Sequence, residues 1–416
     1  MSDQHSSHKM WLSQLKDHLK KERYAAGTAR RCVAVAGHFL AYLETQHVDV
    51  ASAQPADVEG YLQQALRTYQ RRHGHLPGYV GWQTSHTSDI RILLRLVQGQ
   101  WPPDPVAVTP AEILQQDIGE HYAEWMTSLR GLAGASVGDR RDEACRFLDW
   151  MGERATRETL TALTVPEVDA YMKDRAASLR RASLKTVANH IRCFLRWLHI
   201  SLQTTRDLST AVIAPSLYAL EGIPSALRSQ DIEKVLAVTR QDRTQKGRRD
   251  YAILMLLSKY GLRAGEVTAL RLDDMDWHQD VIRIRHTKTC AVTNLPLAPE
   301  VGEAILDYLQ KARPKTSVRE IFIRIHAPYR PFKDGSSLYT QIRHRIEAAG
   351  VITAGKRGPH AFRHARAVSM LRAAVPLKEI GDLLGHRSTD STLVYLKLAS
   401  DDLRAVALEI PGEVKA

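Results

Sequence analysis

One helical pattern occurs twice in the first half of this 416-residue chain. Three pairs of short segments match in the same order: TARRCVAVAGHFLAYL (28–43) with SVGDRRDEACRFLDWM (136–151), VEGY (58–61) with VDAY (168–171), and IRILLRL (90–96) with IRCFLRW (191–197). In both copies the apolar residues recur at helical spacing. The repeat therefore predicts two small all-helical modules, the first lengthened by the insert RRHGHLPGYVGW.

Proline-rich sequence separates the two copies. In WPPDPVAVTPAEIL, the tetrad TPAE (109–112) is typical of a capping box with proline at the first helical position. Gly222 and Pro224 break the pattern again, and Ser229 can cap a new helix. We therefore expect three domains, with boundaries at 1–108, 109–220 and 221–416.

The last part of the chain has a mixed pattern. GRRDYAILMLLSKYG predicts a buried helix that ends at Gly261, and VIRIR (281–285) and NLPL (294–297) predict two strands around the polar turn HTKTCAVT. Further helices are expected at 299–312, 336–349, 363–374 and 376–384. The predicted fold class is mainly α with a small β-sheet, the helical modules coming first.

The charge balance points to a polyanionic partner. Against 46 Asp and Glu stand 58 Lys and Arg, a net charge of +12, and such a surface favours nucleic acid. The four cysteines lack the spacing of a zinc site or a disulfide framework, and no apolar run is long enough for a membrane span. We expect a soluble cytoplasmic protein, associated with the nucleoid, without a metal or cofactor.

Candidate chemistry is concentrated in four stretches of the last domain: GLRAGEV (261–267), HTKT (286–289), PHAFRHA (359–365) and LLGHRSTDSTLVY (383–395). Arg263 and Arg363 offer planar guanidinium groups that match the two non-bridging oxygens of a phosphodiester. Lys288 is expected at the tip of the hairpin, from which an ammonium group can reach into a groove. Tyr395 supplies a phenol that can attack phosphorus when deprotonated.

Histidines accompany these residues. His360 comes three residues before Arg363, so on a helix the two share a face. His386 follows a glycine at a predicted turn, whereas His364 is expected to point elsewhere on its helix. Taken singly, each candidate has an ordinary structural explanation: a solvated arginine or lysine, or a tyrosine in a core. The pattern becomes specific only in combination and order.

In combination, these residues resemble the tyrosine recombinases, the phage integrase family of site-specific DNA recombinases. Members share an Arg in GLR-x-x-E, a hairpin Lys, H-x-x-R, LGH and a tyrosine nine residues after that last histidine. The corresponding residues here are Arg263 with Glu266, Lys288, His360, Arg363, His386 and Tyr395. The resemblance covers about 225–400 and implies that 221–416 is an integrase-type catalytic domain.

The resemblance has departures, both inside the catalytic domain and before it. Phe362 replaces the family's usual Leu, and Ala374-Val375-Pro376 replaces a common glycine turn. Family members carry a helical core-binding module before the catalytic domain, which implies that role for 109–220. A second copy of SAM-like, DNA-binding type at 1–108 is not the usual arrangement, and its role stays open.

The resemblance implies a reaction without metal or ATP. Tyr395 would attack a scissile phosphate and form a 3′-phosphotyrosine bond, while Arg263 and Arg363 stabilise the charge of the transition state. Lys288 would protonate the leaving 5′-oxygen, His360 would assist proton removal or bind the phosphate, and His386 would donate to a phosphate oxygen. The implied function is integration, excision or transposition of a mobile element.

The implied partners are double-stranded DNA at specific recombination sites and further copies of this chain, in a tetramer. In the tail at 401–416, apolar residues at helical spacing predict a helix that packs into a neighbouring protomer, or else caps its own domain: Leu403, Val406, Ala407 and Ile410. Four arginines at matching places in the two modules are candidate DNA contacts, or else solvated positions: Arg91, Arg95, Arg192 and Arg196.

Three other functions stay open at this point. A type IB-like DNA topoisomerase uses the same chemistry and would relax supercoils without a partner site. A non-catalytic DNA-binding regulator built from helical modules would form no covalent adduct. A metal-dependent nuclease would use His360, His364 and His386, although no cluster of further ligands lies near them in the sequence.

Overall fold

The computed structural model describes residues 2–78, 81–104, 106–217, 227–286, 291–353 and 357–385. The chain divides into two compact units, Asp104–Glu221 and a unit that combines Met1–Pro103 with Gly222–Ala416. Buried apolar residues gather in clusters within 15–101, 114–212 and 227–365, with a small one at 367–384. We call these parts the first module (2–103), the second module (104–217) and the C-terminal region (227–385). The three-domain division itself stays a prediction.

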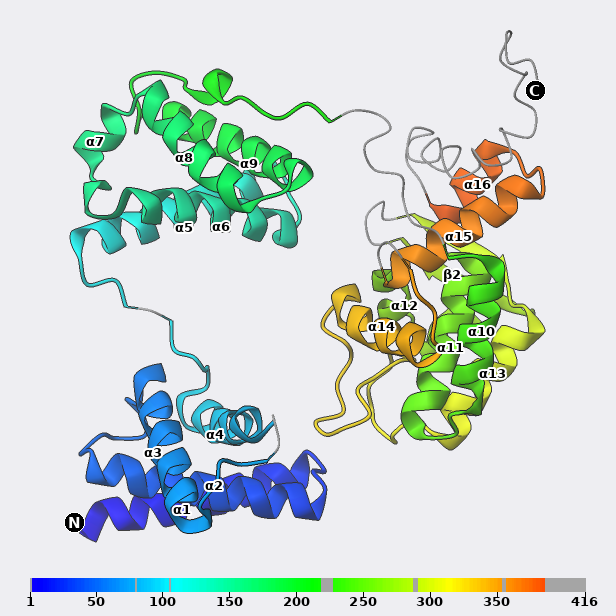
Figure 1. The fold of residues 1–416 in the computed structure, drawn as a ribbon, viewed down its shortest axis with the longest axis horizontal. Coiled ribbons are helices and arrows are strands. Elements are labelled where there is room, and N and C mark those ends of the chain that lie inside the picture. The colour runs from blue at the N-terminus through cyan, green and yellow to red at the C-terminus, as the bar shows by residue number, and fades with distance from the viewer. Residues whose placement is uncertain are drawn as a thin grey trace, which may run out of the picture. The chain divides into compact units, whose positions relative to one another are not determined.

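Both modules are helical, as the repeat predicts (Figure 1). The first module contains α1 (Ser2–Lys21), α2 (Ala26–Thr45), α3 (Pro55–His73) and α4 (Trp82–Gln98). The second contains α5 (Pro110–Ser128), α6 (Gly134–Met151), α7 (Arg157–Thr161), α8 (Val165–Ser178) and α9 (Arg181–Ile200), with short 3₁₀ turns at Gly152–Arg154 and Ser209–Ala211. The matched sequence segments fall on α2 and α6, α3 and α8, and α4 and α9.

The two modules also bury the same aromatic pair. Phe39 of α2 meets Tyr61 of α3 edge-on, with 5.4 Å between ring centroids. Phe147 of α6 meets Tyr171 of α8 in the same way at 5.0 Å. All four side chains are buried, and edge-to-face pairs of this kind add to the stability that burial gives. The sequence repeat is therefore also a repeat of packing.

The predicted capping box begins α5. The hydroxyl of Thr109 accepts from the backbone N–H of Glu112, and the carboxylate of Glu112 accepts from the N–H of Thr109 at 2.9 Å. Pro110 is the first helical residue, where its missing N–H costs nothing. The backbone hydrogen bonds lower the pKa of the Glu112 carboxyl. The proline and the capping box together fix where the second module starts.

The C-terminal region is helical around a small sheet. Its helices are α10 (Ser229–Gln241), α11 (Gln245–Tyr260), α12 (Ala264–Ala269), α13 (Pro299–Lys311), α14 (Tyr339–Ala348), α15 (Pro359–Arg372) and α16 (Leu377–Leu384). Within the described residues, β1 (Met275–Asp276), β2 (Val281–Arg285) and β3 (Val292–Pro296) form one antiparallel sheet in the order β1-β2-β3. Ile282 pairs with Leu295 and Ile284 with Thr293. The mainly α fold class is confirmed.

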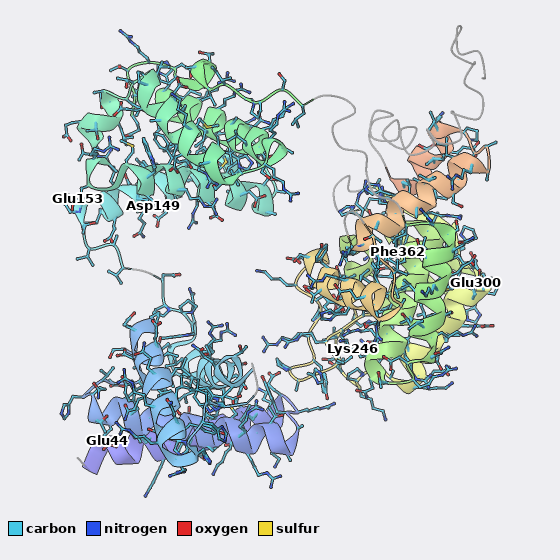
Figure 2. All side chains as sticks on the ribbon, viewed as in Figure 1. Glu44, Asp149, Glu153, Lys246, Glu300 and Phe362 are labelled. Atoms are coloured by element: carbon cyan, nitrogen blue, oxygen red, sulfur yellow. The ribbon has the colours of Figure 1, made fainter. Side chains whose placement is uncertain are left out.

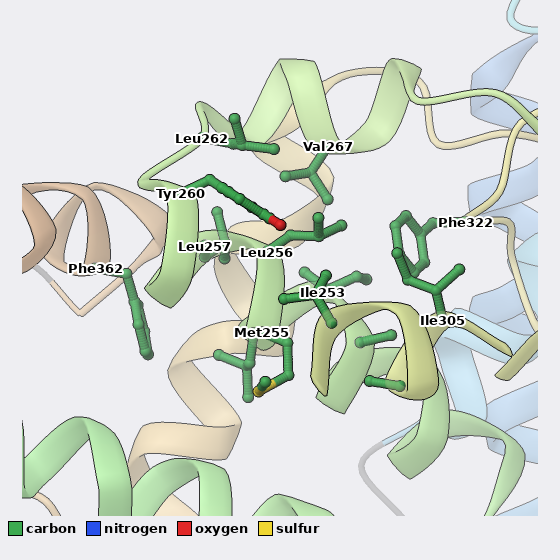
Figure 3. Packing of buried hydrophobic residues seen from close by; sticks show 14 of the residues in the cluster. Ile253, Met255, Leu256, Leu257, Tyr260, Leu262, Val267, Ile305, Phe322 and Phe362 are labelled. Carbon is green, nitrogen blue, oxygen red and sulfur yellow. The ribbon is translucent and has the colours of Figure 1, made fainter. Parts of the chain in front are cut away.

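Helix α11 is the centre of this region. Its segment YAILMLL is apolar on all sides, a pattern that requires cover on all sides. Helices α10, α13 and α15 pack against it, and Ile253, Leu256 and Tyr260 lie in the resulting core (Figure 3). The hydroxyl of Tyr260 donates to the carbonyl of Pro296 at 2.8 Å, which ties α11 to the end of β3.

Phe362 belongs to the same core and is fully buried (Figures 2 and 3). The substitution of Leu by Phe at this position therefore adds ring volume to the core and leaves the phosphate-binding candidates untouched. By contrast, the charged Lys246 and Glu300 lie at the surface of the region (Figure 2). Ala374 takes a left-handed φ of 56°, where glycine is usual, so the departure at 374–376 costs backbone strain.

Two helix starts and one short strand differ from the sequence prediction. Helix α15 begins at Pro359 and not at 363, because proline at the first helical position starts the helix one turn earlier. Ser229 is the first residue of α10, and Arg228 takes the capping position. Strand β1, with two residues, is too short to give a period and was not predicted. No helix in the described part of the chain is long and apolar enough to cross a membrane.

Candidate active site

Arg263 stands at the start of a helix, as its position after Gly261 predicts. Helix α11 ends at Gly261 in the left-handed conformation with φ of 65°, and the chain turns directly into α12. The carboxylate of Glu266 accepts from the backbone N–H of Arg263 at 2.8 Å and from its Nη1 at 2.9 Å. One carboxylate therefore caps the helix and fixes the guanidinium.

Arg363 is almost completely buried, with 3% of its surface exposed. From α15 its Nη1 donates to the carbonyl of Gly261 at 2.8 Å, and its Nη2 donates to the carbonyl of Leu384 at 2.6 Å. A buried guanidinium is costly unless its N–H groups are paired, so these carbonyls offset part of its desolvation.

The two arginines converge on one turn. Nη2 of Arg363 binds the carbonyl of Leu384, and Nη2 of Arg263 binds the next carbonyl, that of Gly385, at 3.0 Å. Residues that are a hundred positions apart in the sequence thus hold the same turn at the end of α16. Their side chains supply two planar forks of N–H donors close together, the arrangement that a phosphodiester needs.

His286 is part of this arrangement and was missed at the sequence level. It is buried, its Nδ1 lies 2.8 Å from Oε1 of Glu266, and its Nε2 lies 3.0 Å from the hydroxyl of Thr293. The signal was present: in VIRIRH the buried positions Ile282 and Ile284 alternate, and His286 continues them on the same face. The polar residues that follow in HTKT hide this alternation at the end of the strand.

Glu266 binds both groups as a carboxylate. Burial alone raises the pKa of Glu266, but hydrogen bonds from His286 and from the backbone and side chain of Arg263 outweigh it, and the net shift is downward. The residue is 3% exposed, so water competes little for the carboxylate. An ionised Glu266 therefore holds the guanidinium of Arg263 and the imidazole of His286 in one network.

Gly385 is required at the turn for two reasons. Its φ of 63° is left-handed, and a Cβ at this position would lie 2.5 Å from Cε1 of His286. Any larger residue would therefore strain the backbone and displace the imidazole. The glycine before His386 thus reflects close packing against the network.

His360 lies in the first turn of α15, exposed, on the same helix as Arg363. Its ring stacks on that of His364, with 6.2 Å between centroids. The prediction that His364 points elsewhere was wrong, because residues four apart on a helix are neighbours and α15 already includes both. Lys288, His386 and Tyr395, like the tail, lie outside the described residues.

The four candidate DNA-binding arginines are placed differently. Arg91, Arg95 and Arg196 are exposed, and Arg192 is partly buried. Arg95 and Arg192 donate to the backbone carbonyls of Trp101 (3.4 Å) and Val212 (2.7 Å). Arg192 and Arg196 also line an open cavity of about 500 Å³ with Arg130 and Arg140, which we call the arginine pocket.

The arginine pocket is suited to an anion. None of the described residues that line it is acidic. Arg140 donates from Nη1 to the carbonyl of Ser136 at 3.0 Å, but its Nε is buried and has no hydrogen-bond partner within the described part of the chain. Four arginines without an acidic side chain among the described lining residues favour an anion in the pocket.

Comparison with known proteins gives consistent matches. Residues 225–401 match the model of the phage integrase family. The integrase/recombinase y4gC of Sinorhizobium fredii is 55% identical over 195 residues, which are 47% of this chain and 100% of that protein. The tyrosine recombinase XerD of Corynebacterium glutamicum is 26% identical over 297 residues, 68% of this chain and 94% of XerD.

A solved structure shares the fold. The XerH site-specific recombinase, in a post-cleavage complex with its palindromic difH substrate, aligns with a TM-score of 0.53 at 16% identity, over 73% of this chain and 98% of XerH. Fold, paired arginines and relatives together define an enzyme that breaks and rejoins DNA strands. The chain belongs to the phage integrase family and is a tyrosine recombinase.

Proposed function

We propose that this recombinase exchanges DNA strands at specific sites through a covalent bond to Tyr395. The observation that supports the proposal is the convergence of Arg263 and Arg363 on the carbonyls of Gly385 and Leu384, directly before His386. A phosphate beside this turn would meet donors from both arginines. The family pattern puts the tyrosine nine residues after His386.

In the proposed first step, the phenolic oxygen of Tyr395 attacks phosphorus, and the bond from phosphorus to the 5′-oxygen breaks. His360 takes the phenolic proton, Lys288 protonates the leaving 5′-oxygen, and His386 donates to a non-bridging oxygen. Arg263 and Arg363 stabilise the charge that develops on the phosphoryl oxygens. A 5′-hydroxyl from another strand then attacks the phosphotyrosine, which restores the diester and frees Tyr395.

A nicked suicide substrate tests this reaction. The wild type should form a covalent protein–DNA product in EDTA, and Tyr395→Phe should form none while it still binds DNA. Arg363→Lys should slow cleavage by about 10²–10³-fold, because one preorganised donor pair is misplaced. Arg343→Ala, an exposed arginine on α14, is the matched control. Adduct formation by Tyr395→Phe would exclude the proposed nucleophile.

The same proposal assigns DNA contacts to the modules. Phosphate oxygens would bind in the arginine pocket, with Arg91 and Arg95 as further contacts in the first module. Substitution of Arg192 and Arg196 by Ala should weaken duplex binding for all sequences and reduce its salt dependence. Arg206→Ala, exposed in the same module, serves as the control. An unchanged salt dependence would remove these residues from the interface.

Synapsis would involve four copies of the chain on two duplexes. The XerH structure contains its difH substrate, which supports a DNA site as the partner here too. We assign residues 1–108 and 109–220 to separate DNA-binding modules and 221–416 to catalysis, in a nucleoid-associated enzyme of a mobile element. Deletion of 401–416 should leave cleavage intact and abolish synapsis if the tail packs into a neighbour, and normal synapsis would show that it does not.

A further inference from the structure

The first module contains an open pocket of about 450 Å³ between α2, α3 and α4. Tyr42 comes from α2, Tyr61, Tyr69 and Arg72 from α3, and Trp82 and His86 from α4. We call this site the aromatic pocket. The described residues that line it include no carboxylate. Its walls therefore combine aromatic rings, imidazoles and one permanent cation.

The rings of the pocket are held in place before any ligand arrives. Trp82 and His86 lie one turn apart on α4 with 4.0 Å between centroids, and Nδ1 of His86 lies 2.9 Å from the carbonyl of Trp82. Tyr69 of α3 faces them, 6.4 Å from the ring of Trp82. A ring that stacks on their exposed faces would not have to order these side chains first, which lowers the cost of binding.

Tyr42 is fixed by a glycine. Its hydroxyl lies against the backbone of Gly60 on α3, in the space that a Cβ at this position would occupy. The small residue lets the phenol of α2 lie directly on α3 at the pocket. Tyr42 also meets Tyr61 at 5.7 Å, so the inner wall is a continuous aromatic surface.

The second module carries an ion pair beside Tyr171, the tyrosine that matches Tyr61. Where the first module has Val35 and Ala65, the repeat puts Glu143 and Arg175. The guanidinium of Arg175 donates to both oxygens of Glu143, at 3.0 and 3.2 Å. In the first module the residue that matches Arg175 is Ala65, which lines the pocket and leaves it without an ion pair at this place.

The lining selects a ligand class. Flat ring faces stack on the faces of nucleobases, and this stacking tolerates any base because every base has a π-face. Arg72 and the imidazoles favour an anion, and the absence of carboxylates in the described lining removes a source of repulsion. We propose that the aromatic pocket binds one nucleotide unit, with its base stacked on the aromatic wall and its phosphate on Arg72.

The nucleotide can come from single-stranded DNA or from a free mononucleotide. The two sources present the same chemistry, so the experiment has an arm for each. A labelled ten-residue oligothymidylate serves as the single-stranded probe, and unlabelled thymidine monophosphate serves as competitor. Duplex DNA of the same length reports on the other basic surfaces of the full-length protein.

The decisive variant transfers the ion pair of Glu143 and Arg175 to the matching positions of the first module. In the full chain, Val35→Glu with Ala65→Arg (the filled variant) should put an arginine side chain into the aromatic pocket at residue 65 and weaken oligothymidylate binding about 5- to 160-fold, the range that loss of one stacked base implies. Ala56→Arg puts the same arginine at an exposed position of α3 and should not weaken it. Trp82→Ala changes the packing less than the double variant and should also weaken oligothymidylate binding. Trp82→Phe should keep most of the wild-type affinity.

The outcomes separate the two sources and can overturn the proposal. If thymidine monophosphate displaces the oligonucleotide from the wild type, the pocket accepts the free nucleotide, and if only longer strands compete, it needs single-stranded DNA. Binding that is equal in wild type, filled variant and Trp82→Ala, with hydrogen exchange confirming that the variants fold, would overturn it. Cleavage through Tyr395 would then be unaffected, so the two proposals fail separately.

Discussion

The first and second modules fold alike around the same aromatic pair and differ beside it. In the second, Glu143 accepts from the hydroxyl of Tyr171 at 2.6 Å, from Arg175, and from Arg146 at 3.2 Å. In the first, the matching position is Val35, and Tyr61 lines an open pocket instead. One scaffold thus holds a closed ionic network in one copy and an open aromatic site in the other.

The arginine pocket gives the opposite contrast. Arg140 of the second module lines that site, while the matching residue of the first is Cys32, which is buried and donates weakly to the carbonyl of Asp89. Burial raises the pKa of the Cys32 thiol to about 12, so it remains neutral. The second module has an open pocket lined by arginines, which favours anions. The first module has an open pocket lined by aromatic rings, which favours flat ring systems. A repeat whose scaffold is kept can therefore divide its contacts between two sites.

The largest expected effect tests what the modules share. Phe39→Ala and Phe147→Ala each remove a fully buried ring and should lower the free energy of unfolding of their own module by about 3–5 kcal/mol. Hydrogen exchange of peptides from each module, measured in the full chain, reports the two losses separately. A loss under about 1 kcal/mol in either module would show that the two cores are not equivalent.

The next effect tests what the modules do not share. Glu143→Gln leaves Arg175, Arg146 and Tyr171 without their ionic acceptor and should destabilise the second module by about 2–3 kcal/mol. This loss is smaller than for a fully buried ion pair, because Arg146 and Arg175 both reach solvent. Exchange in α6 and α8 measures it. The exposed Glu120→Gln on α5 is the control and should change stability by less than about 0.5 kcal/mol.

The comparison also shows which features the sequence could reveal. Period and capping signals predicted both modules, the box at Thr109 and the buried helix α11, because each depends on residues within a few positions. The candidate catalytic arginines were found in the same way, from local motifs. Strand β1 and the early start of α15 were missed, since two residues give no period and one proline moved a boundary.

Contacts between distant residues were not predictable in this way. Arg363 binds the carbonyls of Gly261 and Leu384, and only the folded chain brings these groups together. Ala65 lines the aromatic pocket, and an alanine on a helix face gives no signal of a pocket in the sequence.

A smaller effect concerns the two tyrosines. Tyr171→Phe removes a hydrogen bond to a carboxylate in a buried place and should cost about 1–2 kcal/mol. Tyr61→Phe should cost less, because Val35 stands where the second module has Glu143 and offers no carboxylate to the hydroxyl of Tyr61. Exchange in α8 and α3 compares them. Equal losses would show that the hydroxyl of Tyr61 has a buried role like that of Tyr171.

The smallest effect is a pH dependence of stability that comes from Glu143. Only the second module should show it, because the matching residue of the first module is Val35. Burial raises the pKa of Glu143, but hydrogen bonds from Tyr171 and Arg175 outweigh it and the net pKa is lowered. A lowered folded pKa means that this stability is present above the unfolded value of about 4.3 and is lost as pH falls through the folded value. Protonation leaves the carboxyl able to accept some hydrogen bonds, so less is lost than in Glu143→Gln. The stability difference between wild type and Glu143→Gln should therefore shrink as pH falls from 6 towards 3, and a constant difference would show that Glu143 does not act as a carboxylate.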